Sequence, residues 1–81
     1  MAYLRWKPID PKTASKRENW HKTRAGLLDG IKNVPMSVFV AGDFPTILWI
    51  MGQPSNGPTG HDIERVVKRV NNYYKKKKRT R

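Results

Sequence analysis

A helical repeat of apolar residues near the C-terminus is the feature that most constrains the fold. Between residues 63 and 74, aliphatic and aromatic residues recur so that all of them fall within an arc of about 120° on a helix. They are Ile63, Val66, Val67, Val70, Tyr73 and Tyr74. Thr59 and Asp62 precede the repeat with the spacing of a helix capping box. The pattern therefore predicts a helix from about residue 60 that packs one face on the rest of the chain as far as Tyr74.

The opposite face of this predicted helix, and the tail after it, are basic. Residues 65–81 contain nine lysines and arginines and no acidic residue. Like charges in residues 75–81 repel one another, so we expect a single domain over residues 1–74 and a basic disordered tail over residues 75–81. The candidate phosphate-binding residues of this region are Arg65, Lys68, Arg69, Asn72, Lys75, Lys76, Lys77, Lys78, Arg79 and Arg81.

The positive charge is unevenly distributed along the chain. The formal net charge is +11, yet residues 33–64 contain no lysine or arginine and three acidic residues. A solvated surface without a binding role would spread its charge more evenly. A clustered charge of one sign indicates an anionic partner, and for a small basic chain DNA or RNA is the leading expectation.

A second basic group lies in the first predicted helix, which begins near Asp10 or Ser15 and ends near Gly30. Asp10 followed by Pro11 is a helix-start signal, with an N-cap residue before a proline at the first helical position. The basic residues of this helix are Lys16, Arg17, Lys22 and Arg24. Asn and Arg side chains can read adenine and guanine edges, so this helix is the candidate for base contacts.

Two apolar segments in the middle of the chain predict a β-hairpin. Residues 36–41 read MSVFVA and residues 46–51 read TILWIM, with a compact turn between them. The second segment does not alternate between apolar and polar residues, so both of its faces require cover. We therefore expect an interface with a protein partner or a second copy of the chain. Its candidate residues are Phe39, Phe44, Ile47, Trp49 and Met51.

These elements predict a small single α+β domain in the order (β)-α-(α)-β-β-α, in which residues 1–9 form either a short edge strand or an extended arm. Two helices followed by a hairpin resemble the element order of winged-helix DNA-binding domains. The resemblance is one of order alone, because no sequence motif of that family is present and the hairpin lacks the basic residues of a wing that contacts phosphate.

The composition argues against catalysis and metal binding. The chain has no cysteine, and His21 and His61 are its only histidines, so neither a zinc site nor a recognisable catalytic pair is expected. No apolar segment is long enough to cross a bilayer or to form a signal peptide, and we expect an intracellular protein of the cytoplasm, nucleoid or nucleus.

The expected function is that of a small nucleic-acid-binding accessory protein without cofactors. One alternative is an inhibitor or adaptor that docks the apolar hairpin on a larger nucleic-acid-processing machine. Another is a structural component of a ribonucleoprotein or virion. The composition leaves open whether the partner is DNA or RNA, single-stranded or double-stranded.

Overall fold

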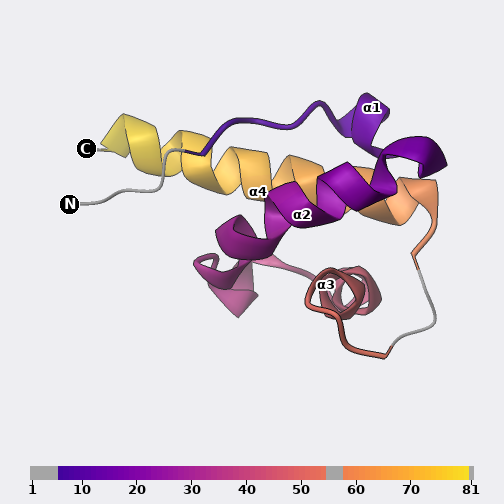
Figure 1. The fold of residues 1–81 in the computed structure, drawn as a ribbon. Coiled ribbons are helices and arrows are strands. Elements are labelled where there is room, and N and C mark those ends of the chain that lie inside the picture. The colour runs from indigo at the N-terminus through magenta and orange to yellow at the C-terminus, as the bar shows by residue number, and fades with distance from the viewer. Residues whose placement is uncertain (1–5, 55–57, 81) are drawn as a thin grey trace.

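The structure is a computed structural model that describes residues 6–54 and 58–80, with side chains as far as Lys76. These residues form helices and contain no strand (Figure 1). The α-helices are α1 (Pro11–Ala14), α2 (Trp20–Lys32), α3 (Phe44–Ile50) and α4 (Gly60–Thr80). Three 3₁₀ turns, η1 (Arg17–Asn19), η2 (Met36–Val38) and η3 (Ala41–Asp43), connect them. The predicted α+β class is therefore wrong, and the element-order resemblance to winged-helix domains is lost with the hairpin.

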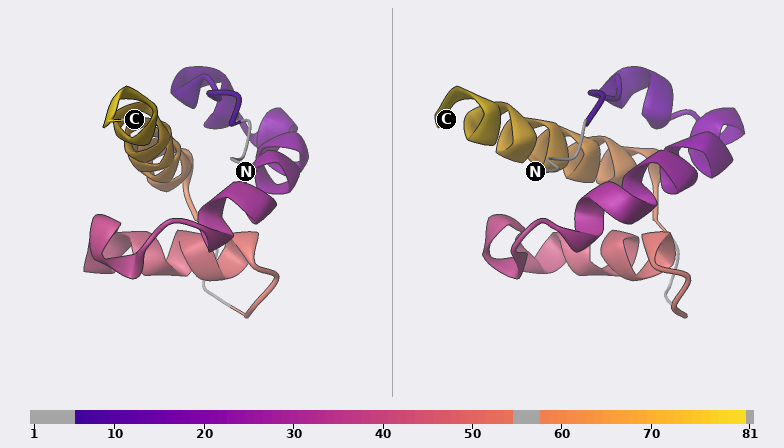
Figure 2. Two further views of the ribbon diagram at one scale, coloured as in Figure 1. Left: turned by 90° about the vertical axis from the view of Figure 1, so that its left-hand side faces the viewer. Right: turned by 60° about the vertical axis from the view of Figure 1, so that its left-hand side comes forward.

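Helices α2, α3 and α4 enclose one core. In both views of Figure 2, α4 and α3 lie on opposite sides of the molecule and α2 crosses between them. The short α1 packs against α4. The buried aliphatic side chains of these three helices are Leu27, Ile31, Ile47, Ile50, Ile63, Val66, Val67 and Val70. The apolar face predicted for the C-terminal helix is thus confirmed as the largest contribution to the core.

The segment predicted as the second strand of the hairpin is helix α3. Ile47 and Ile50 face the core at helical spacing, while Leu48 is exposed on the other side. Pro45 lies in the first turn, where proline is favoured because that position needs no N–H donor. A short apolar run cannot distinguish a strand from a buried helix by periodicity alone, and packing against α2 and α4 overrides the β propensity of its residues.

Gly52 ends α3 in a Schellman motif. Its φ of 79° lies in the left-handed region that favours glycine. The Gly52 N–H donates to the Trp49 carbonyl at 3.1 Å, and the Gln53 N–H donates to the Leu48 carbonyl at 2.8 Å. Two carbonyls at the helix end are thereby satisfied, which fixes the point where the chain leaves α3.

The segment predicted as the first strand forms the turns η2 and η3 instead. Phe39 is buried between them and anchors the segment to the core. The side chain of Asp43 accepts a hydrogen bond from the Val40 N–H at 3.2 Å, which closes η3 and leads directly into α3. The backbone N–H and C=O groups of this segment form hydrogen bonds within local turns. They are therefore not available for the hydrogen bonds between strands that a hairpin requires.

The first predicted helix is divided into α1 and α2. Asp10 caps α1 as expected, accepting hydrogen bonds from the Lys12 N–H at 3.3 Å and the Thr13 hydroxyl at 2.7 Å. Ser15 ends α1, and its hydroxyl donates to the Lys12 carbonyl at 2.8 Å, so it does not start a helix. Gly30 does not end α2, which continues to Lys32.

Residues 6–9 run beside α4 without forming a strand, and residues 1–5 of the predicted strand lie outside the described residues. Asn71 of α4 holds this segment in place. Its side-chain oxygen accepts from Trp6 Nε1 at 3.0 Å and from the Ile9 N–H at 3.2 Å, and its Nδ2 donates to the Ile9 carbonyl at 2.7 Å. The Trp6 ring stacks on Tyr74 with centroids 5.1 Å apart.

Two glycines of α2 are expected to respond oppositely to alanine. A Cβ at Gly30 would overlap Cζ3 of Trp6 and stand 2.8 Å from its Cε3, so Gly30→Ala should displace the indole and destabilise the fold by about 1–3 kcal/mol. A Cβ at Gly26 would meet only Ile9 Cδ1, at 3.5 Å, so Gly26→Ala should stabilise by up to about 1 kcal/mol. Urea denaturation measures both changes. Equal effects of the two substitutions would contradict the packing of Trp6 against α2.

Candidate nucleic-acid interface

The N-terminus of α4 is fixed by the predicted capping box. The Thr59 N–H donates to Asp62 Oδ2 at 3.0 Å, and the Asp62 N–H donates to the Thr59 hydroxyl oxygen at 3.2 Å. These bonds satisfy donors that a helix start leaves free. The Thr59 backbone and side-chain hydrogen bonds, and then the charge of Arg65, hold the pKa of Asp62 below its usual value.

Acid should weaken this cap. A carboxyl whose pKa is lower in the folded state contributes stability at pH above its unfolded value, and that contribution is lost as the pH falls through the folded value. We expect Asp62→Asn to lower the thermal midpoint by a few degrees at pH 7 and to have little effect near pH 2. Asp29→Asn, which removes an exposed acid within α2, serves as the control and should not lower the midpoint at either pH.

The outward face of α4 carries the exposed cations predicted from the sequence. Arg65, Lys68 and Lys75 are exposed along it, together with Asn72 and Lys76. Arg65 pairs with Asp62, and Lys68 Nζ lies 3.4 Å from Glu64 Oε2. Both pairs are largely exposed, and such pairs contribute at most about 1 kcal/mol, so a phosphate can replace them.

The backbone of α4 continues as a helix beyond Tyr74. The helix has 21 residues and is therefore about 30 Å long. The backbone of Lys77, Lys78 and Arg79 is helical, whereas Arg81 lies outside the described residues. The expected domain boundary after Tyr74 and the disorder of the tail stay predictions. Because no acid follows Glu64, the positive charge density rises toward this end.

Arg69 has a different environment from the other candidates on α4. Its Nε donates to Oδ2 of Asp43, whose side chain is 1% exposed while that of Arg69 is 33% exposed. The pair joins α4 to the turn before α3. Arg69 is thus engaged within the fold, and the exposed cations of α4 are its neighbours.

The arginines of the second basic group lie over tryptophans. The Arg17 guanidinium is 5.7 Å from the Trp20 ring centroid, and the Arg24 guanidinium is 5.3 Å from that of Trp49. The two indoles meet edge to face, with centroids 5.8 Å apart. Lys16 and Lys22 are exposed beside them. Arg17 and Arg24 are therefore linked by two contacting indole rings, since each guanidinium lies over one ring of the pair. The sequence pattern did not reveal this contact.

The residues predicted for a partner interface separate into two sets. Phe39 and Ile47 are buried in the core, and Trp49 packs on Trp20, so these three do not form a free surface. Phe44 at the start of α3 and Met51 directly after its end are exposed. Sequence reasoning missed the exposed apolar residues that accompany them, which are Leu28, Met36, Val40 and Leu48.

Within residues 6–54 and 58–80, no three His, Cys, Asp or Glu side chains come together in a way that could hold a metal ion. Over the same residues, no helix combines the length and apolar character that a membrane crossing requires. The strongest local concentration of one chemical character is the positive charge of α4.

Comparison of the chain with models of protein families, with curated proteins and with solved structures found no match. Function is therefore inferred from the geometry and charge of the chain itself.

Proposed function

We propose that this protein binds nucleic acid by placing the outward face of α4 against the phosphate backbone. The observation that carries the proposal is the division of α4 into two faces. The inward face is fully buried at Val66, Val67 and Val70, so the helix is held rigidly. The outward face presents Arg65, Lys68 and Lys75 to solvent.

Phosphate neutralisation supplies the binding energy in this mechanism. Each phosphate that meets a lysine or arginine releases condensed counterions, which gives a salt slope of about 0.9 per contact on duplex DNA. Backbone contacts carry no sequence information directly, so α4 provides affinity without selecting a base sequence. Such a role places the protein where DNA or RNA is present, in the cytoplasm, nucleoid or nucleus.

Binding of the whole chain to nucleic acid tests the proposal. Fluorescence anisotropy with single-stranded and double-stranded DNA and RNA at about 50 mM salt should give dissociation constants of about 10⁻⁴–10⁻⁶ M or tighter. Affinity should fall steeply as salt is added. Absence of binding to all four polymers at this salt concentration would overturn the proposal.

The exposed stripe on α3 favours self-association as a second function. Phe44 and Leu48 are four residues apart on one side of α3, and both are more than a third exposed. Residues 33–64 contain no lysine or arginine. Two copies with a net charge of +11 repel one another, and this segment is where they can approach with least repulsion.

A dimer through α3 would leave both α4 helices free, because α3 and α4 lie on opposite sides of the molecule (Figure 2). Sedimentation equilibrium at moderate salt should show a dimer for the natural sequence and a monomer for Leu48→Gln. Leu48 is exposed, so its replacement leaves the buried core unchanged, and Lys12→Gln is the control. A monomeric natural protein at high micromolar concentration would contradict this second function.

A further inference from the structure

Three basic side chains follow one another from the turn η1 into the first half of α2. Arg17, His21 and Arg24 are four and three residues apart, which places them on one side of the helical path. Within the part of the chain that the structure describes, none of the three has a carboxylate at ion-pair distance. This sets them apart from Arg69, whose charge is balanced inside the fold by Asp43.

Arg24 is the most firmly held of the three. Its guanidinium lies 5.3 Å from the Trp49 ring centroid, and its Nη2 is 3.3 Å from the position that a Cβ would take on Gly52. A guanidinium stacked on an aromatic ring keeps the N–H groups at its edge available for a phosphate. Because Trp49 already restricts the side chain, less conformational entropy is lost when an anion binds.

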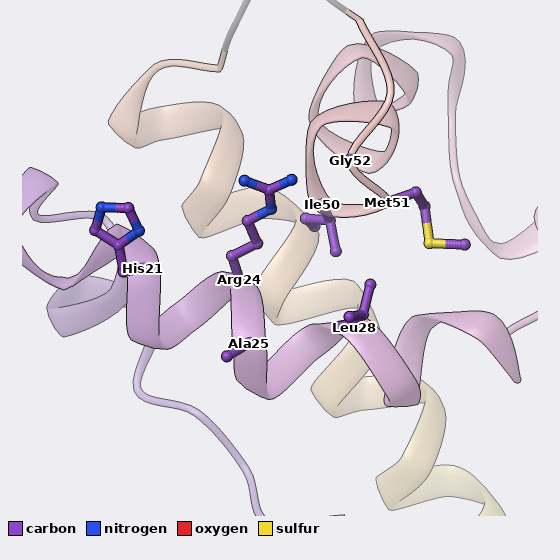
Figure 3. A pocket seen from close by; sticks show the side chains of 7 residues that line it. All are labelled: His21, Arg24, Ala25, Leu28, Ile50, Met51 and Gly52. Atoms are coloured by element: carbon purple, nitrogen blue, oxygen red, sulfur yellow. The ribbon is translucent and has the colours of Figure 1, made fainter.

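An apolar hollow begins beside this guanidinium. It has a volume of about 320 Å³ and lies between α2 and the end of α3. Figure 3 shows His21 and Arg24 at one side of the hollow and Leu28, Ile50 and Met51 at the other. The hollow thus combines a cationic edge with an apolar wall, which suits a ligand that has an anionic part joined to a flat apolar part.

The spacing of the cations indicates a polymer of phosphates. Arg17 and Arg24 are seven positions apart in the sequence, and their guanidinium groups stack on different rings, those of Trp20 and Trp49. They therefore offer two separate cationic groups, and successive phosphates of one strand provide an anion for each. The Met51 thioether in the wall is a favourable neighbour for an aromatic ring, which points to a nucleobase in the hollow.

From this geometry we propose that the groove between α2 and α3 binds an unpaired nucleotide of a single strand. Arg24 and Arg17 hold its phosphates, and the base lies against Leu28 and Met51. A paired base is enclosed in the duplex and cannot enter the hollow. The proposal deepens the proposed function and rests on it, because α4 supplies the general affinity while this groove adds a preference for single strands.

The test compares the natural sequence with two variants that each lose one positive charge from α2, and with a third, Arg24→Lys, that keeps the charge. Arg24→Gln removes the stacked guanidinium, and Lys22→Gln removes an exposed neighbour that does not line the hollow. Each is titrated at one salt concentration with a single-stranded DNA oligonucleotide and with a perfectly paired duplex of the same length. Tryptophan fluorescence reports the surroundings of Trp6, Trp20 and Trp49 together, anisotropy reports affinity, and circular dichroism confirms that the variants fold.

Arg24→Gln should weaken single-strand binding about tenfold or more, the effect of losing a charge-assisted hydrogen bond, and should change duplex binding by less than about threefold. Lys22→Gln should lower the affinity for the single strand and for the duplex slightly and to the same extent. Arg24→Lys, which keeps the charge and loses the planar fork, should recover part of the affinity. Single-strand binding should also change the tryptophan emission more than duplex binding does.

If Arg24→Gln and Lys22→Gln lose the same affinity for each polymer, and the natural protein still binds both, the proposal of a nucleotide site in the groove is overturned. The proposed role of α4 is then unaffected. If the natural protein binds neither the single strand nor the duplex, the proposed function and this inference are both overturned.

Discussion

Replacing Arg69 by methionine is expected to destabilise the fold by about 2–4 kcal/mol, because it leaves the Asp43 carboxylate buried without its cationic partner. The value is below that of a fully buried pair, since Arg69 is one-third exposed. Asp43 Oδ1 already has no hydrogen-bond partner within the described residues, so the loss of Arg69 cannot be compensated on that side. Urea denaturation followed by circular dichroism measures the change.

Lys68→Met is the matched control for this prediction. Lys68 is the preceding residue on α4, and its pair with Glu64 is exposed, so its loss should change the unfolding free energy by about 0.5 kcal/mol or less. Combining Arg69→Met with Asp43→Asn completes a double-mutant cycle, and a coupling of about 1–3 kcal/mol is expected. Similar effects of Arg69→Met and Lys68→Met would contradict the structural role of this ion pair.

Removing three charges from the outward face of α4 is expected to weaken nucleic-acid binding about 10²–10³-fold at low salt, since phosphate contacts provide most of the nonspecific affinity. The variant combines Arg65→Gln, Lys68→Gln and Lys75→Gln. Its control combines Lys7→Gln, Lys12→Gln and Lys32→Gln, exposed lysines outside α4, and loses the same net charge. The control should bind within about fivefold of the natural protein, because only the long-range field changes.

Equal losses in the two triple variants would show that total charge, and not the face of α4, determines binding. Both variants should keep the unfolding free energy of the natural protein within about 1 kcal/mol, because the substituted side chains are exposed and their ion pairs are weak. Anisotropy titrations with the same duplex, at one salt concentration, compare the three proteins directly.

Helix α4 was the element that could be predicted best from the sequence. Its capping residues Thr59 and Asp62, its buried valines and its exposed cations all follow from a local pattern with a period of 3.6 residues. Local patterns suffice here because the helix is long, strongly amphipathic and capped by its own side chains.

The hairpin prediction failed because it gave most weight to the β propensity of residues 46–51. Two nearby signals favour a helix. Pro45 stands where a helix starts, and Gly52 stands where one ends. Residues 46–51 do not alternate between apolar and polar types, and this predicted a partner on both faces of a strand. The segment is instead a helix, with its inner side in the core and Leu48 exposed on its outer side.

The roles of three other residues depend on tertiary contacts that no local pattern contains. Arg69 lies at the edge of the basic face, and its partner Asp43 is 26 residues away. Asn71 is 62 residues from Ile9, which it joins to α4. Arg24 stacks on Trp49, which is 25 residues away in the sequence.

The salt dependence of duplex binding tests the role of α4 most directly. The logarithm of the binding constant is measured against the logarithm of salt concentration for the natural protein, the α4 triple variant and the control variant. Because each phosphate contact contributes about 0.9 to the slope on duplex DNA, the slope of the α4 variant should be smaller in magnitude by about 2–3. The control should keep the slope of the natural protein. Identical slopes for all three proteins would contradict binding through the outward face of α4.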